Sequence, residues 1–146
     1  MRNRFWTTMA LAAIGVTLAS AVPAMASENT AAGTVPWSVS LGTASAAGNR
    51  WTETRSTGYG QDLVLNGKLT NTGAGCYSLW AQYWHDFSGT PAAKQVEICG
   101  PGTVDVNVRH RYDYMTTGQV TICKGTTNTT DCAPWVDVTW WPIGTS

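Results

Sequence analysis

Hydrophobic and polar residues alternate along much of the chain after residue 34. The clearest alternation covers residues 104–114, where Val, His and Tyr occupy one set of positions and Asp, Asn and Arg the other. Successive side chains of a β-strand point to opposite faces, so a period of two predicts a strand with one buried and one solvated face. Residues 35–41 repeat the pattern and predict a second half-buried strand.

Turn-forming residues divide the rest of this region into further short strands. The other expected strands are 51–57 (at a sheet edge), 63–69, 76–87, 94–99, 119–124 and 135–141. The cluster Asn71-Thr-Gly-Ala-Gly75 predicts a hairpin, and the small residues at 42–49 predict a loop. Seven or eight short strands without a convincing helix predict an all-β fold, an antiparallel β-sandwich that occupies residues 35–146 as a single domain.

The first 26 residues have the layout of an export signal. Arg2 and Arg4 give a basic start, residues 9–21 form a short apolar run, and Ala24-Met25-Ala26 offers a cleavage point. A membrane anchor is the alternative, but the run is shorter than the roughly 20 residues that span a bilayer. Residues 27–34 are small, polar and aperiodic, which predicts a flexible N-terminal arm. We therefore expect a secreted protein that has no membrane contact once the signal is cleaved.

Four cysteines lie in the part of the chain that would be exported, namely Cys76, Cys99, Cys123 and Cys132. An even number of cysteines in an oxidising compartment predicts two disulfides. Three pairings can be drawn, and we favour Cys76 with Cys99 and Cys123 with Cys132 because both are local. Zinc is the competing interpretation. The chain has no Cys-x-x-Cys pair and thiolates rarely survive export, so we predict no metal site.

The composition disfavours several classes of function. Nine Lys and Arg balance nine Asp and Glu, and charged residues make up only 12% of the chain, which argues against a nucleic-acid-binding protein. The sequence has no nucleophile elbow, phosphate-binding loop, dinucleotide fingerprint or HExxH segment. Its only histidines are His85 and His110. His85 and Asp86 point to opposite strand faces, and His110 falls on the apolar side of its strand, as expected for a hydrogen-bonded core residue. We expect no enzyme activity and no cofactor.

Tryptophan is the unusual residue of this sequence, because seven of the eight follow residue 26. A small core does not easily enclose seven indoles, and Trp, Tyr and Arg concentrate in binding hot spots. Consecutive Trp140 and Trp141 must face opposite sides of a strand, so at least one lies outside the core. We therefore expect a contact surface for a partner. Its candidate residues are Trp37, Trp51, Trp80, Trp84, Trp135 and Trp141, together with Arg109 and Arg111.

Two classes of binding follow, and we favour a protein partner outside the cell. The chain would then be a non-catalytic adaptor whose N-terminal arm adds to the partner, and it would need a large curved apolar patch beside the arm. The alternative is a carbohydrate-binding module, which would need a row of Trp and Tyr rings rimmed by hydrogen-bonding groups. A third alternative is an enzyme inhibitor that presents the loop Cys99-Gly-Pro-Gly102.

Two resemblances add to these expectations. The run Leu63-Val-Leu-Asn-Gly-Lys-Leu-Thr-Asn-Thr-Gly73, followed by an aromatic strand, resembles the B and C strands of immunoglobulin-like modules in bacterial secreted proteins. This resemblance implies an immunoglobulin-like sandwich. In length, export signal, cysteine count and N-terminal arm, the chain resembles the adaptor subunits of actinobacterial umbrella toxin particles, which join a lectin-like subunit to a toxin stalk. That layout implies a role in a toxin complex and identifies no site residues.

Overall fold

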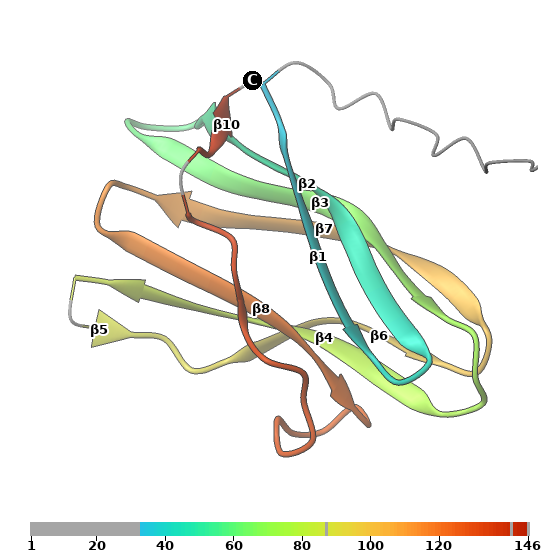
Figure 1. The fold of residues 1–146 in the computed structure, drawn as a ribbon. Helices are drawn as coiled ribbons and strands as arrows, with labels where there is room; N and C mark the ends of the chain where they lie inside the picture. The colour runs from blue at the N-terminus through green and yellow to red at the C-terminus, as the bar shows by residue number, and fades with distance from the viewer. Residues whose placement is uncertain (1–32, 87, 141, 146) are drawn as a thin grey trace, which may run out of the picture.

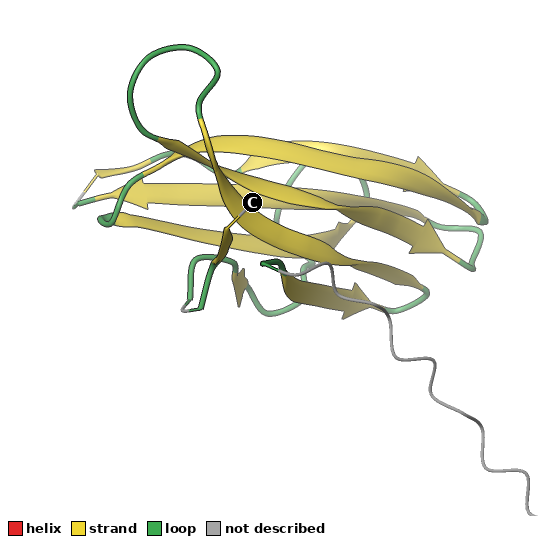
Figure 2. Ribbon diagram, turned by 90° about the horizontal axis from the view of Figure 1, so that it is seen from above, coloured by secondary structure: helices red, strands yellow, loops and turns green. Residues whose placement is uncertain are grey.

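The computed structural model describes residues 33–86, 88–140 and 142–145, and these form two β-sheets packed face to face (Figure 1). The predicted export signal and residues 27–32 of the predicted arm lie outside the described residues. Figure 2, seen from above, shows strands and loops, with no helix in the part of the chain described. No described segment is therefore a helix that could cross a membrane. The predicted all-β sandwich is confirmed, while its closer likeness to immunoglobulin-like modules stays a prediction.

Sheet A contains five strands. Its main path is β1 (Val35–Leu41), β2 (Ala44–Thr54), β3 (Gln61–Asn71) and β7 (Gly102–Tyr112), each antiparallel to its neighbour. The short strand β10 (Gly144–Thr145) pairs in parallel with β2. The predicted strands 35–41 and 104–114 are thus present, the second one shifted by two residues, because it begins at Gly102 and ends at Tyr112.

Sheet B also contains five strands. Its path is β5 (Ser88–Gly89), β4 (Cys76–His85), β8 (Thr116–Lys124) and β9 (Val136–Asp137), and β6 (Ala93–Cys99) also pairs with β4. Strands β5 and β6 pair with successive stretches of β4 on the same side. The predicted last strand 135–141 is wrong in extent, because pairing with β8 is limited to Val136 and Asp137.

The core lies between the two sheets and consists of the inward-facing residues of each. Trp37 belongs to it and is only 5% exposed. In the register of sheet A, Trp37 lies opposite Gly48, and Gly48 lies opposite Gly67. A Cβ on either glycine would collide with the backbone of the neighbouring strand, so glycine is required at both positions. Trp37 is therefore paired in the sheet with a position that carries no side chain.

Three predictions about the first half of the chain are wrong. The turn at 71–75 does not make a hairpin, because β3 and β4 lie in different sheets and the turn carries the chain between them. Residues 44–49 are strand rather than loop, with Ala44 and Ala46 buried in the core. The strand that continues through residue 54 is not at an edge where the predicted segment begins, because Trp51 and Thr52 pair with β3 on one side and with β10 on the other.

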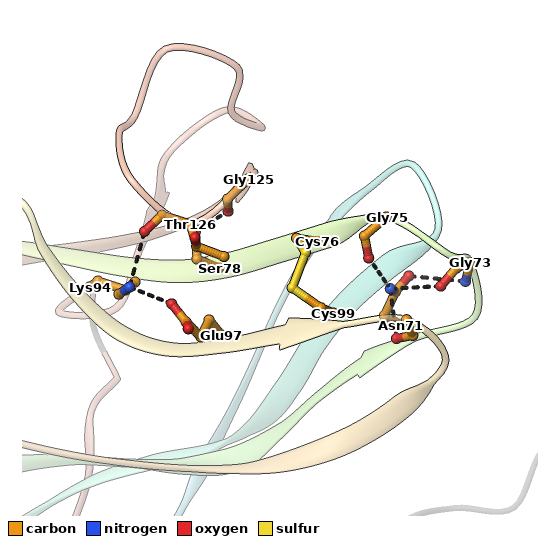
Figure 3. The surroundings of a disulfide bond; sticks show 11 residues. Asn71, Gly73, Gly75, Cys76, Ser78, Lys94, Glu97, Cys99, Gly125 and Thr126 are labelled. Carbon is orange, nitrogen blue, oxygen red and sulfur yellow. Dashed lines mark hydrogen bonds and ion pairs between the residues drawn. A yellow bond between two sulfur atoms is a disulfide. The ribbon is translucent and has the colours of Figure 1, made fainter.

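The two disulfides have the predicted pairing. Cys76–Cys99 joins β4 to β6 at directly opposed positions, and Cys123–Cys132 closes the loop that follows β8. Around the first disulfide, Ser78 donates a 2.7 Å hydrogen bond to Gly125 O, which holds the second loop against β4 (Figure 3). Both bridges therefore stabilise the same end of sheet B.

The C-terminal segment crosses from one sheet to the other. Its strand β9 pairs with β8 of sheet B and its strand β10 pairs with β2 of sheet A, as the red trace of Figure 1 shows. Arg50, buried on β2, holds the crossing: its Nη1 donates to Asp137 O and its Nη2 to Trp140 O, both at 3.0 Å. Burial lowers the pKa of this guanidinium, partly offset by nearby Asp137.

Candidate binding site

The structure places the predicted contact residues on separate parts of the molecule. Trp37 does not belong in that set, because its side chain is part of the core and only 5% of the residue is exposed. Trp51, Arg109 and Arg111 lie on the outer face of sheet A, while Trp80 and Trp84 lie on the outer face of sheet B. Trp135 is half-buried before β9, and Trp141 lies outside the described residues.

The outer face of sheet A has one half-buried indole beside a shallow hollow. Trp51 Nε1 donates to Glu53 Oε2 at 3.3 Å, and the same carboxylate group pairs with Arg109. The hollow, about 690 Å³, is bordered by Trp51 and by polar side chains that include Asn49 and Asn66. The indole is thus held against the sheet and only partly open to a ligand.

The outer face of sheet B uses its indoles to support neighbouring segments. Trp80 Nε1 donates to Ser78 Oγ at 2.8 Å, and Ser78 in turn bonds the loop closed by the second disulfide. The indole of Trp84 lies against Gly89 of β5, where a Cβ would collide with the ring. Both tryptophans therefore have structural contacts that account for their positions.

A second concave surface lies beside the turn that joins β7 to β8. This turn is at the left of Figure 1. Two strongly exposed aromatic side chains border it: Tyr114 is 91% exposed and Trp140 is 72% exposed. The groove between them has a volume of about 530 Å³. Its remaining lining residues are Tyr112, Thr116, Thr117, Asp137 and Thr139. We call this surface the Tyr114–Trp140 groove.

Local hydrogen bonds fix both walls of the groove. On the Tyr114 side, Asp113 Oδ1 accepts from Met115 N at 3.0 Å and from Thr116 Oγ1 at 3.1 Å, which closes the turn. On the Trp140 side, Asp137 Oδ1 accepts from the backbone N of Thr139 at 2.7 Å and from its hydroxyl at 3.0 Å. The carbonyl of Trp140 is held by Arg50 as described above. The exposed rings therefore stand on a constrained backbone.

The chemistry available in the groove is that of binding. Burial, together with Asp113 and Asp137, raises the pKa of Tyr112, so this phenol stays protonated at neutral pH and can act as a hydrogen-bond donor. Thr117 adds a hydroxyl group and Asp137 adds a carboxylate, while the hydroxyl groups of Thr116 and Thr139 already donate to Asp113 and Asp137. Among the described residues, no three His, Cys, Asp or Glu side chains converge in a way that could hold a metal ion.

Both aromatic walls of this groove are absent from the predicted contact set. The pair Trp140-Trp141 indicates that one indole leaves the core, but alternation alone does not say which one, and the predicted contact set contains Trp141 and not Trp140. Alternation places Tyr114 on the buried face of its strand, whereas β7 ends at Tyr112 and leaves Tyr114 in the turn. A polar turn sequence, Asp113-Tyr-Met-Thr116, was the available signal that the strand stops there.

Comparison with known proteins assigns the chain to no family. No protein-family model matches the chain, and no curated protein and no solved structure matches it. The Tyr114–Trp140 groove is therefore the strongest evidence about function.

Proposed function

We propose that this protein is a secreted carbohydrate-binding module and that the Tyr114–Trp140 groove is its site. One observation carries the proposal: two exposed aromatic rings border a groove whose other walls are hydroxyl groups and one carboxylate. A sugar ring has an apolar C–H face that packs on an aromatic ring and hydroxyl groups that require hydrogen-bond partners. Ligand sites generally combine apolar walls with a few placed polar groups in this way. The two disulfides are compatible with an extracellular protein.

The constrained backbone of the groove supports the same proposal. Binding is weakened by the entropy of ordering side chains and loops, so a site that is already ordered retains more of its contact energy. Arg50 fixes the carbonyl of Trp140 and the Asp113 turn fixes Tyr114. The rings are therefore presented before any ligand arrives.

Charge favours an uncharged ligand. Among the described residues that line the groove, Asp137 is the only charged one, and one of its oxygens is already occupied by Thr139. None of these lining residues is cationic, so none would attract a uronic acid or a sulfated sugar. We therefore name neutral polysaccharides as the ligand class.

The test is binding to a panel of neutral polysaccharides, measured by affinity electrophoresis and by calorimetry with soluble oligosaccharides. Trp140→Ala and Tyr114→Ala are each expected to weaken binding at least tenfold. Trp84→Ala is the matched control, because it removes an indole on the outer face of sheet B and should leave affinity unchanged. The proposal fails if no polysaccharide of the panel binds, or if Trp140→Ala binds as well as the unmodified protein.

A protein partner is the second candidate, because Met115 and Tyr59 are also exposed and belong to turns at the same end of the sandwich. In that case the chain acts as an adaptor in an extracellular complex, such as a toxin particle, and the N-terminal arm contributes. Deleting residues 27–32 separates the candidates. Adaptor function predicts weaker partner binding with unchanged folding, whereas carbohydrate binding predicts no loss. The deletion stops before Gly33, because Gly33 lies against β10.

A further inference from the structure

The only two histidines of the chain meet across the sandwich. His85 is the last residue of β4 in sheet B, and His110 lies near the end of β7 in sheet A. Their Nε2 atoms are 3.1 Å apart. The ring of His110 also stacks on Tyr83, with centroids 3.6 Å apart and the planes nearly parallel. Two residues 25 positions apart in sequence, on different sheets, are thus fixed with their Nε2 atoms facing each other.

The hydrogen bonds around the pair determine where the protons are. The hydroxyl of Thr116 has one proton, and the carboxylate of Asp113 takes it at 3.1 Å. Thr116 Oγ1 must then accept from His85 Nδ1, which is also 3.1 Å away. His85 therefore carries its proton on Nδ1 and has a free lone pair on Nε2. Without another ligand, that lone pair accepts the Nε2 proton of His110.

We propose that His85 and His110 bind a divalent transition-metal ion, Cu²⁺ or Zn²⁺, through their two Nε2 atoms. With metal–nitrogen bonds of about 2.0–2.1 Å, a 3.1 Å separation of the nitrogens corresponds to an N–metal–N angle of about 95–102°. This angle lies between the square-planar and tetrahedral values. The ion would lie about 40° off the line that joins the two nitrogens. The ring centroids are 5.3 Å apart, so the rings meet nearly head-on and both must turn to point their lone pairs at the ion. His110 must transfer its proton from Nε2 to Nδ1, so binding releases no net proton from the neutral pair.

The surroundings of His85 have the form of a metal ligand's outer shell. Metal-binding histidines commonly donate their second ring N–H to a carboxylate or another acceptor, which fixes the tautomer and makes the ligating nitrogen more basic. Here Thr116 accepts that proton and Asp113 Oδ2 lies 3.8 Å from the same nitrogen. The side chain of His85 is 33% exposed, so an ion can reach it from solvent.

The remaining coordination positions would be open to water or to an added ligand, because no third His, Cys, Asp or Glu converges on the pair among the described residues. The four cysteines take no part, because they form the two disulfides. The inference depends on the histidines and their partners alone and does not require that the groove binds sugar.

The test is a Zn²⁺ titration of the untagged protein, followed by ¹⁵N NMR of the imidazole rings. Because the chain has two histidines, both sets of signals can be assigned without ambiguity. We expect His85 to carry its proton on Nδ1 before metal is added, and both Nε2 signals to shift together and saturate at one ion per chain. With Cu²⁺, electron paramagnetic resonance should show coupling to two imidazole nitrogens.

Variants complete the test. His85→Asn and His110→Asn should each weaken metal binding at least tenfold, and Thr116→Val, which retains both histidines, should weaken it about 10- to 100-fold. Circular dichroism checks that each variant is folded. The proposal is overturned if neither imidazole shifts at millimolar Zn²⁺, or if a folded His85→Asn variant binds the ion as tightly as the unmodified protein. The first criterion needs no variant, so a misfolded variant does not leave the question open.

Discussion

Replacing Asn71 with alanine is expected to destabilise the end of the sandwich that lies opposite the groove. Asn71 is 1% exposed, and its Nδ2 donates to Gly73 O, Gly75 O and Gly100 O at 2.8–2.9 Å. Its Oδ1 accepts from Thr43 Oγ1 at 2.7 Å and from Gly73 N at 3.0 Å. One side chain thus joins the β1–β2, β3–β4 and β6–β7 turns, two of which carry the chain between sheets. Figure 3 shows Asn71 with its partners Gly73 and Gly75.

The magnitude follows from these contacts. Five hydrogen bonds at about 1 kcal/mol each give an upper value of about 5 kcal/mol. Two protons serve three carbonyl acceptors, and the exposed Gly75 can exchange its bond for one to water, so the loss is smaller. We expect Asn71→Ala to lower the free energy of unfolding by about 3 kcal/mol, which for a domain of this size lowers Tm by roughly 10 °C.

Urea denaturation followed by tryptophan fluorescence measures this loss. Asn107→Ala is the control, because Asn107 is exposed on β7 and should change stability by less than about 0.5 kcal/mol. Asn71→Asp keeps the shape of the side chain but replaces its NH2 group by a carboxylate oxygen. That oxygen would face the carbonyl oxygens to which the Asn71 amide donates, so this variant should lose at least as much free energy of unfolding near neutral pH. If Asn71→Ala unfolds at the same urea concentration as the control, the three turns do not depend on this residue.

Three further outcomes can be checked. Arg50→Met should release the C-terminal crossing. We expect faster hydrogen exchange between residues 138 and 144, and a polysaccharide affinity reduced to that of Trp140→Ala. Unchanged hydrogen exchange would contradict the role of Arg50. Tyr83→Phe should raise the free energy of unfolding by about 1 kcal/mol, because the buried Tyr83 hydroxyl has no hydrogen-bond partner among the described residues; a loss of stability in urea would reveal a contact for that hydroxyl. Replacing Cys123 and Cys132 by serine should cost about 2.6 kcal/mol and replacing Cys76 and Cys99 about 3.4 kcal/mol, as expected for sequence separations of 9 and 23. Thermal denaturation that ranks the two pairs in the opposite order would contradict the loop-length reasoning.

The sequence correctly predicts those parts of the fold that are determined by residues close together in the chain. The alternation in 35–41 and 104–112 reports directly which face of each strand is buried, and two local cysteine pairs point to their own partners. The wrong predictions depend on residues elsewhere. Ala44 and Ala46 resemble a loop in sequence, yet they are buried because the opposing sheet covers them. The 71–75 turn has hairpin chemistry, but the strand after it joins another sheet.

The candidate site was harder to predict for the same reason. Whether an indole is buried depends on the space that distant strands leave for it: Trp37 is enclosed beside Gly48 and Gly67, which lie on two other strands. Trp140 is exposed but held in place because Arg50, far away in the sequence, binds its carbonyl. The meeting of His85 with His110 likewise requires the two sheets to be packed. Composition predicted a surplus of aromatic rings, and only the packed structure locates it.

The crossing of the C-terminal segment also sets an order of events during synthesis. Arg50 and Trp140 are 90 residues apart, and β2 obtains its β10 partner only when that later part of the chain is available. A nascent chain that emerges N-terminus first therefore waits with an unfinished sheet edge and an unbound guanidinium until nearly all of its strands have been made. Translation and any passage through a membrane would precede final closure, so the finished molecule forms in the compartment where the last residues arrive.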